Sequence, residues 1–424
     1  MERTLIEETG AGREVRLCGW IHRLRVLKNA AFIVLRDLSG TVQIVASPEQ
    51  VAGLKLEDVI EVTGLVRAEP RAAGGREVEW RSGRILNRAV SILPFTSAST
   101  LENVPTEVQL QHRPLSLRTE AVGEIFRVQA AILELFRAHL RADRFTEIVT
   151  SKLVATGTEG GSNLFEVKYF ERVAYLAQSP QFYKEHGVAG LERVFETGHV
   201  YRAEPHATSR HLTEYCSLDL ELGFVESAEP VMELERRLLT AMFTELNRRF
   251  GESIRRRSGA FLPELTKAPI WEFPECVERL RLAGITSPEA DLTPEGERML
   301  CTIAERELGV PAVFVVGFPL SKRPFYVHPR GENGAAQSFD LLFRGLEITT
   351  GGQRLHTREA LEASLRSRGL APGPFEGHLR MFELGMPPHG GLAIGLERLT
   401  AQVLGLANVR EATLYPRDRV HLAP

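Results

Sequence analysis

The sequence predicts a multidomain protein in which a small closed β-barrel precedes a large α+β domain. Between residues 13 and 95, short alternating segments are separated by turn residues at close spacing. From residue 121 onward, longer amphipathic segments alternate with apolar, strand-like runs. A chain of 424 residues is long enough for about two or three domains. We expect the barrel in residues 1–95, a linker in 96–119 and the α+β domain in 120–424.

Five β segments are predicted in the first domain. Asp37–Gly40 and Pro70–Gly75 supply glycine, proline and polar residues for the turns between them. Five short strands in one small domain favour a closed Greek-key barrel, of which the OB-fold is the commonest nucleic-acid-binding version. The segments are residues 13–25, 31–36, 42–46, 58–66 and 77–86.

The residues after the barrel change character twice. Residues 96–119 are polar and contain prolines, which is typical of a linker or hinge. Apolar residues within 121–140 then step by three or four, which predicts an amphipathic helix, and a strand is expected at 145–149. Further strands are predicted at 311–317 and 338–343, and further helices at 228–249 and 358–369.

Composition excludes several classes of protein. The chain carries 52 Lys and Arg against 55 Asp and Glu, a net charge of −3, and no apolar stretch is long enough to cross a bilayer. Four scattered cysteines are too few for a disulfide framework or a zinc site. The first residues are charged and lack the apolar core of a signal peptide. We therefore expect a cytoplasmic protein that does not associate with membranes.

Two alternating runs, Val194–Arg202 and Tyr215–Phe224, flank a polar loop and predict a long hairpin. Charged and polar side chains gather on it, among them Arg202 and Glu204. An arginine suits a phosphate because its planar fork donates two parallel hydrogen bonds and stays charged. Taken alone, the pattern also fits a solvated hairpin with cross-strand salt bridges.

A glycine-rich segment lies near the C-terminus, where Gly390, Gly391 and Gly395 precede a predicted helix that carries Arg398 in its first turn. Closely spaced glycines allow a backbone to approach a ligand. The segment matches neither the GxGxxG pattern nor the GxxxxGK[ST] phosphate loop. Any nucleotide site here is therefore of another kind.

Two shorter groups of polar residues could also bind ligands. Glu347 and Thr350 are oxygen donors three residues apart, which suits a Mg²⁺ ion that keeps most of its waters, although Glu347 alone could be a surface carboxylate. Gln178, Gln181 and Lys184 step by three, so at the start of a helix they share one face. Such a face suits a small anionic ligand, and an exposed helix start is the alternative.

Together these segments resemble the class II aminoacyl-tRNA synthetases, in the subclass with an N-terminal anticodon-binding OB-fold. Within it, QSPQxxK at 178–184, RPFY at 323–326 and SFDLLFRGLEITTGGQR at 338–354 are similar to aspartyl-tRNA synthetases of the archaeal type. The resemblance covers essentially the whole chain. It implies a catalytic domain built on an antiparallel sheet, ATP as substrate with Mg²⁺, L-aspartate, a homodimer and tRNA(Asp), with tRNA(Asn) left open as a second acceptor.

The resemblance also implies roles at the ATP end of the site. Arg202 and Arg398 are the implied catalytic residues, with Arg202 on the α-phosphate and the substrate carboxylate and Arg398 on the γ-phosphate. Glu347 and Thr350 would hold Mg²⁺. The other implied ATP-binding residues are Tyr215 on the adenine, Glu204 near it, and His211 on the β- and γ-phosphates.

At the amino-acid end, Lys184 and Arg354 would pair with the side-chain carboxylate of aspartate, because a buried anion requires cations. Asp219, Gln178 and Ser179 would take the α-amino group. The other implied amino-acid-binding residues are Gln181, Tyr326 and Glu159, the last in a loop that closes over the amino acid.

In the barrel, Phe32 would stack on an anticodon base while Gln43 and Glu77 read base edges, as readers of single strands do. The implied reaction is in-line attack of the aspartate carboxylate on the α-phosphorus, followed by transfer from aspartyl-adenylate to the terminal ribose of the tRNA. Positioning and charge stabilisation are the main contributions of the protein.

The sequence departs from the family pattern at several positions. Ser151 stands where the first family motif normally ends in a proline at the dimer interface, and Gly187 is costly within a helix. The loop 28–32 and His211–Glu214 lean toward asparaginyl-tRNA synthetase. That enzyme, a tRNA-independent amino-acid ligase and a non-enzymatic tRNA-binding protein are the alternatives, whereas Lys184 and Arg354 disfavour a cationic lysine substrate.

Overall fold

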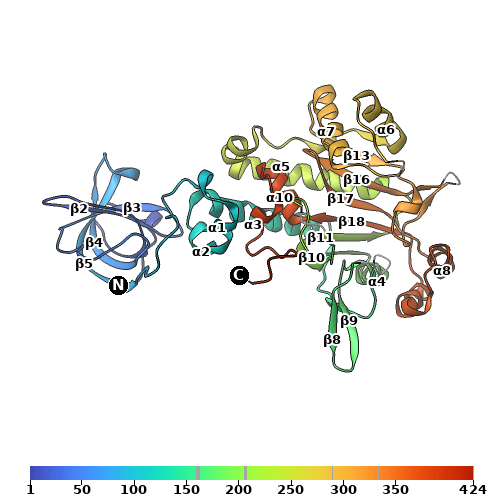
Figure 1. The fold of residues 1–424 in the computed structure, drawn as a ribbon, viewed down its shortest axis with the longest axis horizontal. Helices are drawn as coiled ribbons and strands as arrows, with labels where there is room; N and C mark the ends of the chain where they lie inside the picture. The colour runs from blue at the N-terminus through green and yellow to red at the C-terminus, as the bar shows by residue number, and fades with distance from the viewer. Residues whose placement is uncertain (159–162, 205–207, 289, 332–333, 424) are drawn as a thin grey trace. The chain divides into compact units, whose positions relative to one another are not determined.

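The computed structural model describes residues 1–158, 163–204, 208–288, 290–331 and 334–423. The chain divides into two compact units, Met1–Glu124 and Ile125–Pro424 (Figure 1). The finer division into residues 1–95, 96–119 and 120–424 stays a prediction.

The first unit is built on the predicted five-stranded barrel. Its closed order is β1-β2-β3-β5-β4, antiparallel except for the parallel pair of β3 and β5. Alternate residues of each strand, such as Leu17, Ile33 and Ile44, are fully buried inside it. The elements are η1 (Ile6–Glu8), β1 (Glu14–Val26), β2 (Ala31–Arg36), β3 (Thr41–Ala46), β4 (Val59–Ala68), η2 (Ala73–Gly75) and β5 (Arg76–Asn87).

The segment expected to be a linker carries helical turns and contacts the barrel. It contains η3 (Leu101–Asn103), α1 (Thr106–Gln111) and α2 (Arg113–Ser116). Glu57 of the barrel accepts a hydrogen bond from Ser97 N at 2.7 Å and pairs with Arg118 at 3.2 Å. Arg118 also lies over the ring of Trp20 at 5.1 Å. The segment is therefore anchored to its own unit.

The second unit is built around an eight-stranded sheet of order β12-β13-β16-β17-β18-β11-β10-β6. The six central strands are antiparallel, as expected, whereas each edge strand pairs in parallel with its neighbour. The bounds are β6 (Thr146–Glu147), β10 (Arg193–Tyr201), β11 (Glu214–Gly223), β12 (Ile270–Glu272), β13 (Ala312–Val316), β16 (Ser338–Phe343), β17 (Leu346–Gln353) and β18 (His389–Gly395).

Helices cover the sheet, and the largest core lies between its strands and α3 (Glu120–Ala142), α5 (Glu229–Ser258) and α10 (Leu396–Leu404) (Figure 1). Among the residues described, no helix combines the length and the apolar character that crossing a bilayer requires. The remaining helices are α4 (Gln181–Leu191), η4 (Leu265–Lys267), α6 (Phe273–Leu282), α7 (Pro294–Leu308), η5 (Leu320–Lys322), α8 (Arg358–Ser367), η6 (Gly373–Phe375), α9 (Glu376–Leu379), η7 (Arg380–Leu384) and η8 (Val409–Ala412).

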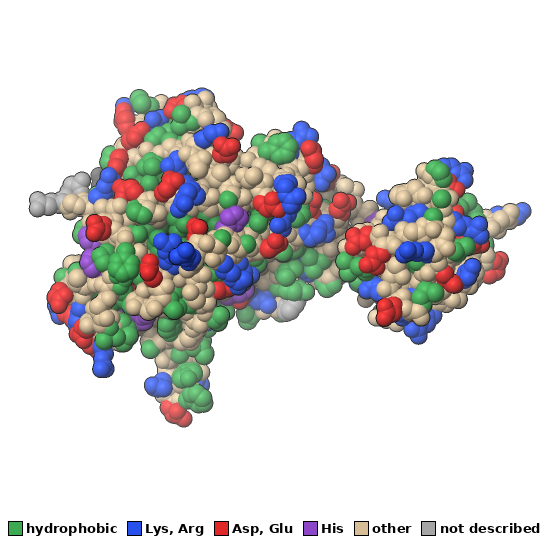
Figure 2. All heavy atoms as spheres, turned by 180° about the vertical axis from the view of Figure 1, so that it is seen from behind, with side chains coloured by type: hydrophobic (Ala, Val, Ile, Leu, Met, Phe, Trp, Pro, Cys, Tyr) green, Lys and Arg blue, Asp and Glu red, His purple; other side chains and the backbone are tan. Residues whose placement is uncertain are grey.

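Two small sheets complete the unit. One is formed by β7 (Leu153–Val154), β9 (Arg172–Leu176) and β8 (Glu166–Tyr169), and the other by β14 (Pro329–Arg330) and β15 (Ala335–Ala336). The β8–β9 hairpin projects from the second unit, and hydrophobic side chains are exposed on it (Figures 1 and 2). Phe170 at its turn is 73% exposed and Val173 is 56% exposed.

The structure supplies a reason for each of two departures noted in the sequence. Near Ser151, Glu196 of β10 accepts hydrogen bonds from Thr150 N at 2.8 Å and Thr150 Oγ1 at 2.7 Å, and pairs with Lys152 at 3.0 Å. This carboxylate fixes a segment that a proline would otherwise stiffen. At Gly187 in α4, a Cβ atom would meet Val194 at 3.1 Å, so the glycine lets the helix approach β10 closely.

Candidate active site

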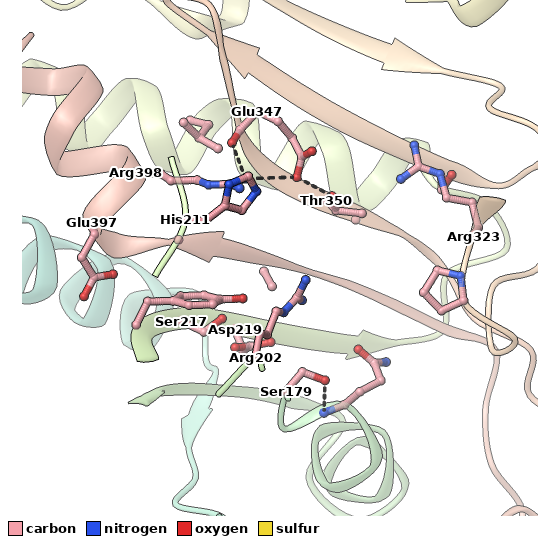
Figure 3. Close-up of a pocket in the computed structure, with 18 of the residues that line it drawn as sticks. Ser179, Arg202, His211, Ser217, Asp219, Arg323, Glu347, Thr350, Glu397 and Arg398 are labelled. Atoms are coloured by element: carbon pink, nitrogen blue, oxygen red, sulfur yellow. Dashed lines mark hydrogen bonds and ion pairs between the residues drawn. The ribbon is translucent and has the colours of Figure 1, made fainter. Parts of the chain in front are cut away.

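A cavity of about 360 Å³ opens in the second unit, between the β10–β11 hairpin, the strands β16–β18 and the first residues of α4 and α10 (Figure 3). Its lining is rich in charge, with more cations than carboxylates. The cationic residues are Lys184, Arg202, Arg210, Arg323, Arg354 and Arg398, and the acidic ones are Glu204, Asp219, Glu347 and Glu397. Such a lining suits a ligand with several negative charges.

One end of the cavity is built on a buried ionic cluster. Lys184 Nζ lies 3.1 Å from both Asp219 Oδ1 and Glu221 Oε2, and Arg354 Nε donates to Glu221 Oε1 at 2.9 Å. Burial opposes the charge of Arg354, but Glu221 raises the pKa of this guanidinium. All four side chains are almost fully buried, so their mutual contacts replace the water that each has lost.

Gly391 on β18 makes room for this cluster. β18 pairs with β11 so that Gly391 lies opposite Glu221. A Cβ atom on Gly391 would come within 2.1 Å of Glu221 Oε2. The glycine-rich segment is thus a strand, and at Gly391 the missing side chain admits a carboxylate of the protein itself.

At the other end of the cavity, Arg398, Glu347 and Thr350 lie together (Figure 3). Arg398 occupies the first turn of α10, as expected, and donates to Glu347 O at 3.0 Å. Its Nη1 is 3.6 Å from Glu347 Oε1, which also accepts from Thr350 Oγ1 at 3.1 Å. Glu347 and Thr350 lie on β17, and Arg398 lies on the helix that follows β18. The antiparallel pairing of β17 with β18 therefore brings the two motifs together.

Arg210 and Glu297 form an ion pair beside this group. Glu297 lies on α7, and its Oε2 accepts from Glu347 N at 2.9 Å. Burial, with the nearby Glu347 charge, raises the pKa of Glu297, although Arg210 opposes this. The pair holds the start of β17 in place.

The β10–β11 hairpin and the residues that follow β10 contribute further cationic side chains to the cavity. Arg202 Nη1 lies 3.8 Å from Glu204 Oε1, and its guanidinium sits 5.9 Å from the ring centroid of Tyr215. His211 Nε2 is 4.0 Å from Glu204 Oε2, while its Nδ1 is 2.7 Å from Thr208 Oγ1. Arg202, His211 and the cluster around Glu347 therefore border one cavity (Figure 3).

Of the residues predicted to bind ATP, Mg²⁺ or the amino acid, all but two line this cavity. Gln178 is buried and is not among the lining residues, and Glu159 lies outside the described residues. The roles assigned to all of these residues stay predictions. Those that line the cavity are Ser179, Gln181, Lys184, Arg202, Glu204, His211, Tyr215, Asp219, Tyr326, Glu347, Thr350, Arg354 and Arg398.

Sequence reasoning missed four charged residues of the site, namely Arg210, which is described above, Arg323, Glu397 and Glu221. Arg323 lines the cavity and forms a two-fold pair with Asp340 at 2.9 and 2.8 Å. Glu397 accepts from Cys216 N at 3.1 Å, and burial raises its pKa to about 7. Glu221 could have been found from SLDLELG, where acidic residues at alternate positions share one face of a strand and leucines the other.

Glu347 and Thr350 offer a carboxylate and a hydroxyl oxygen from one strand. These are the donors that Mg²⁺ prefers, and two protein ligands suffice for an ion that keeps waters and binds substrate phosphates. Among the described residues, no group of three His, Cys, Asp or Glu side chains converges as a metal site.

The three residues predicted to read an anticodon share an outer face of the barrel in the first unit. Gln43 lies opposite Glu77 in the β3–β5 pair, and its Nε2 donates to Glu77 Oε2 at 2.9 Å. Phe32 on β2 is paired with Val45, two residues from Gln43, and points to the same side. All three side chains are partly exposed.

Comparison with known proteins identifies the family. A model of the family described as "tRNA synthetases class II (D, K and N)" matches residues 105–419. The chain belongs to the class II tRNA synthetases. As a member, it is a ligase that uses ATP as a substrate. A model described as an OB-fold nucleic acid binding domain matches residues 15–85, in agreement with the barrel.

Individual relatives cover the whole of this synthetase. The aspartate–tRNA(Asp/Asn) ligase of Deinococcus radiodurans is 44% identical, with 100% of this chain and 99% of the relative covered. The aspartate–tRNA(Asp) ligase of Pyrobaculum aerophilum is 38% identical, with 97% and 96% covered. The crystal structure of asparaginyl-tRNA synthetase from Pyrococcus horikoshii, complexed with asparaginyl-adenylate, has a TM-score of 0.92 at 29% identity and covers 100% of both chains.

Proposed function

We propose that this class II synthetase activates L-aspartate with ATP and transfers the aspartyl group to the 3′ end of tRNA(Asp). The names of the Deinococcus and Pyrobaculum relatives support aspartate as the amino acid. The observation that carries the proposal is the balance of charge in the buried cluster of Lys184, Asp219, Glu221 and Arg354.

The cluster favours a substrate with an anionic side chain. If Asp219 receives the α-ammonium group of the amino acid, Lys184, Arg354 and Glu221 remain with a net charge of +1. A carboxylate in the substrate side chain neutralises that charge, whereas the amide of asparagine leaves it unpaired in a buried site, which is costly. This argument weighs against the asparaginyl alternative.

At the ATP end, Arg202 and Arg398 line the cavity, and in this proposal they hold the phosphates and stabilise the charge that develops on them. Tyr215 offers its ring to the adenine, and Glu347 and Thr350 are the residues that would hold Mg²⁺. That ion, when bound, would neutralise phosphate charge.

The proposed chemistry needs no covalent intermediate with the enzyme. The aspartate α-carboxylate attacks the α-phosphorus in line, pyrophosphate leaves, and aspartyl-adenylate remains. A terminal ribose hydroxyl of the tRNA then takes the aspartyl group and releases AMP. The chain contributes mainly by aligning the aspartate carboxylate with the α-phosphorus.

Selection of tRNA belongs in this proposal to the barrel, through stacking of a base on Phe32 and hydrogen bonds between base edges and the side chains of Gln43 and Glu77. The Deinococcus relative is named for both tRNA(Asp) and tRNA(Asn), and the Pyrobaculum relative for tRNA(Asp) alone. Retention of the barrel weighs against a tRNA-independent ligase. Retention of Arg202, Glu347 and Arg398 weighs against a non-enzymatic protein.

The proposal also includes a cytoplasmic homodimer formed across the edge of the sheet that ends in β6. Val149, two residues past that strand, is 94% exposed, and Leu153 and Phe170 further along the chain are exposed as well. Exposed apolar side chains beside an edge strand are typical of an interface.

The decisive experiment measures pyrophosphate exchange with aspartate or asparagine, followed by charging of separate tRNA(Asp) and tRNA(Asn) transcripts. We expect exchange with aspartate and charging of tRNA(Asp). Charging of tRNA(Asn) with aspartate as well would establish two acceptors. Exchange with asparagine alone would refute the proposal, and exchange without any charging would favour the tRNA-independent ligase.

A further inference from the structure

Behind the amino-acid end of the cavity lies a buried carboxylate to which the proposed mechanism gives no role. Glu185 on α4 is 0% exposed. Its Oε1 accepts a hydrogen bond from Gln181 Nε2 at 2.6 Å, one turn earlier in the same helix. Gln181 itself lines the cavity, so the contact joins a buried charge to a residue that faces the substrate.

The other oxygen of Glu185 faces two histidines. His378 Nε2 lies 3.4 Å and His389 Nε2 3.9 Å from Glu185 Oε2. His389 Nδ1 is 2.9 Å from Pro387 O, which can only accept, so this nitrogen carries a proton. His378 Nδ1 is 2.9 Å from His186 Nε2, an arrangement that a neutral His378 satisfies by accepting there.

This environment keeps Glu185 ionised. Burial by itself would raise its pKa, but the facing His389, with His378 and the Gln181 amide, lowers the pKa to about 2. Burial opposes the charge of His389, yet the adjacent Glu185 raises its pKa. Burial lowers the pKa of His378 to about 4. Glu185 therefore carries its negative charge at physiological pH, with His389 beside it.

An ionised carboxylate can accept hydrogen bonds but cannot donate them. The amide of Gln181 must therefore turn its NH₂ group toward Glu185, which leaves the carbonyl oxygen Oε1 toward the cavity. A carbonyl oxygen accepts from a donor such as an ammonium group and offers nothing to a second acceptor. The neighbouring Asp219 and Ser179 side chains also present acceptor oxygens to the cavity.

We propose that Glu185 is a positioning residue that fixes the amide of Gln181, so that Gln181 Oε1 accepts a hydrogen bond from the α-ammonium group of the amino acid. The inference rests on the proposed function, because it takes the amino acid to bind at this end of the cavity. It adds a source of selectivity for α-amino acids over acids of the same length that lack the amino group.

Glu185→Gln tests the proposal, because a neutral amide at residue 185 can donate or accept and no longer dictates the orientation of Gln181. In pyrophosphate exchange, we expect the KM for aspartate to rise about tenfold, while kcat and the KM for ATP change less than about twofold. Succinate lacks the α-ammonium group, so its inhibition constant should stay within about twofold of the wild-type value.

Two comparisons separate positioning from a general structural effect. In a Gln181→Ala background, Glu185→Gln should raise the KM for aspartate no further, because the group through which it acts is gone. Glu235→Gln, which alters another fully buried carboxylate on α5, should leave the KM unchanged. If Glu185→Gln does not fold, Glu185→Asp keeps the charge near the histidines, withdraws the acceptor from Gln181 and should raise the KM alike.

An unchanged KM for aspartate in a folded Glu185 variant would overturn the inference, as would equal weakening of aspartate and succinate. An additive effect in the Gln181→Ala background would overturn it too. Failure of the wild-type protein to exchange pyrophosphate with aspartate would instead refute the proposed function, so the two failures are distinct.

Discussion

Glu221 joins the two cations on which amino-acid recognition is proposed to depend. Its two oxygens contact Lys184 and Arg354 separately, which fixes the spacing of these cations before any substrate arrives. Without Glu221, two positive charges would share a buried site and repel each other. Glu221 is not among the residues that line the cavity, yet it fixes the positions of the two positive charges that do line it.

Replacement of Arg354 by alanine should raise the KM for aspartate by about 100-fold or abolish activation. The variant leaves the buried Glu221 with Lys184 alone and removes the net positive charge, and loss of one partner of a buried pair costs about 3–5 kcal/mol. Pyrophosphate exchange measures the effect, and calorimetric ATP binding should remain measurable. Arg330→Ala, at an exposed pair with Glu272, is the matched control. Near-normal use of aspartate would show that the side-chain pocket lies elsewhere.

At this scale, the sequence predicted the residues whose motifs are local. Lys184, Glu347 and Arg398 were found because spacing within one segment, together with the family resemblance, was enough to single them out. Arg323 and Glu221 were missed because their importance lies in contacts with distant elements. Arg323 pairs with Asp340 of β16. Glu221 pairs with Lys184 of α4 and with Arg354, which follows β17. The amino-acid sequence of a single protein does not reveal which helices and strands pack against one another in the fold.

At the scale of elements, the packing of α5 on the sheet buries a carboxyl group. Glu235 on this helix is 0% exposed and lies near Thr349 of β17. Burial, with the charge of Asp340, raises its pKa from 4.5 to about 8, although Thr349 opposes the shift. The folded protein therefore keeps a proton between these pH values that the unfolded chain releases. Stability must fall as pH rises through this window.

Glu235→Gln should remove this dependence, since an amide does not titrate. Relative to wild type, we expect the variant to be more stable at pH 8 than at pH 5 by about 4 kcal/mol, because each pH unit between the unfolded pKa of 4.5 and the folded pKa of about 8 is worth about 1.4 kcal/mol. Denaturant unfolding at both pH values measures this. Glu233→Gln, at a half-exposed carboxylate of the same helix, should show no such change. A parallel pH response of wild type and Glu235→Gln would contradict the burial argument.

Element type was more predictable than element length. The five barrel strands and the β10–β11 hairpin form as expected. In the barrel strands, the alternating apolar residues of the sequence become the alternating buried residues of the fold. The strand expected at 145–149 is reduced to Thr146–Glu147, because only these residues pair with β10. The helix expected at 228–249 continues to Ser258, where Gly259 in the left-handed region ends it.

At the scale of the whole molecule, the two units are expected to serve different steps. Phe32→Ala should lower kcat/KM for charging by about 10–100-fold, because stacking on one base is worth about 1–3 kcal/mol. It should leave pyrophosphate exchange unchanged, because that step needs no tRNA. Leu38→Ala, at an exposed turn of the same barrel, should affect neither assay. Equal loss in both assays would contradict this division of labour.

The proposed dimer can be tested at the edge of the sheet. Val149→Glu should convert a dimer into monomers at micromolar concentration, because a carboxylate would be buried without a partner at the interface. Analytical ultracentrifugation measures the mass of each species. Leu282→Glu changes another exposed apolar residue, 72% exposed at the end of α6, and should leave the assembly intact. A monomeric wild type would refute the proposed dimer, and the exposed apolar residues would then need a different binding partner.

The close approach of Gly391 to Glu221 restricts how amino-acid preference can evolve. A change toward a neutral substrate must discard a positive charge, yet removing Lys184 or Arg354 alone strands Glu221. Removing Glu221 first leaves the two cations to repel each other. A larger residue at 391 opens no other route, because its Cβ would also come within 2.2 Å of the backbone oxygen of Leu220. Each of these single substitutions is therefore deleterious by itself. A change of amino-acid preference requires paired substitutions, so the preference for an anionic substrate is protected by epistasis.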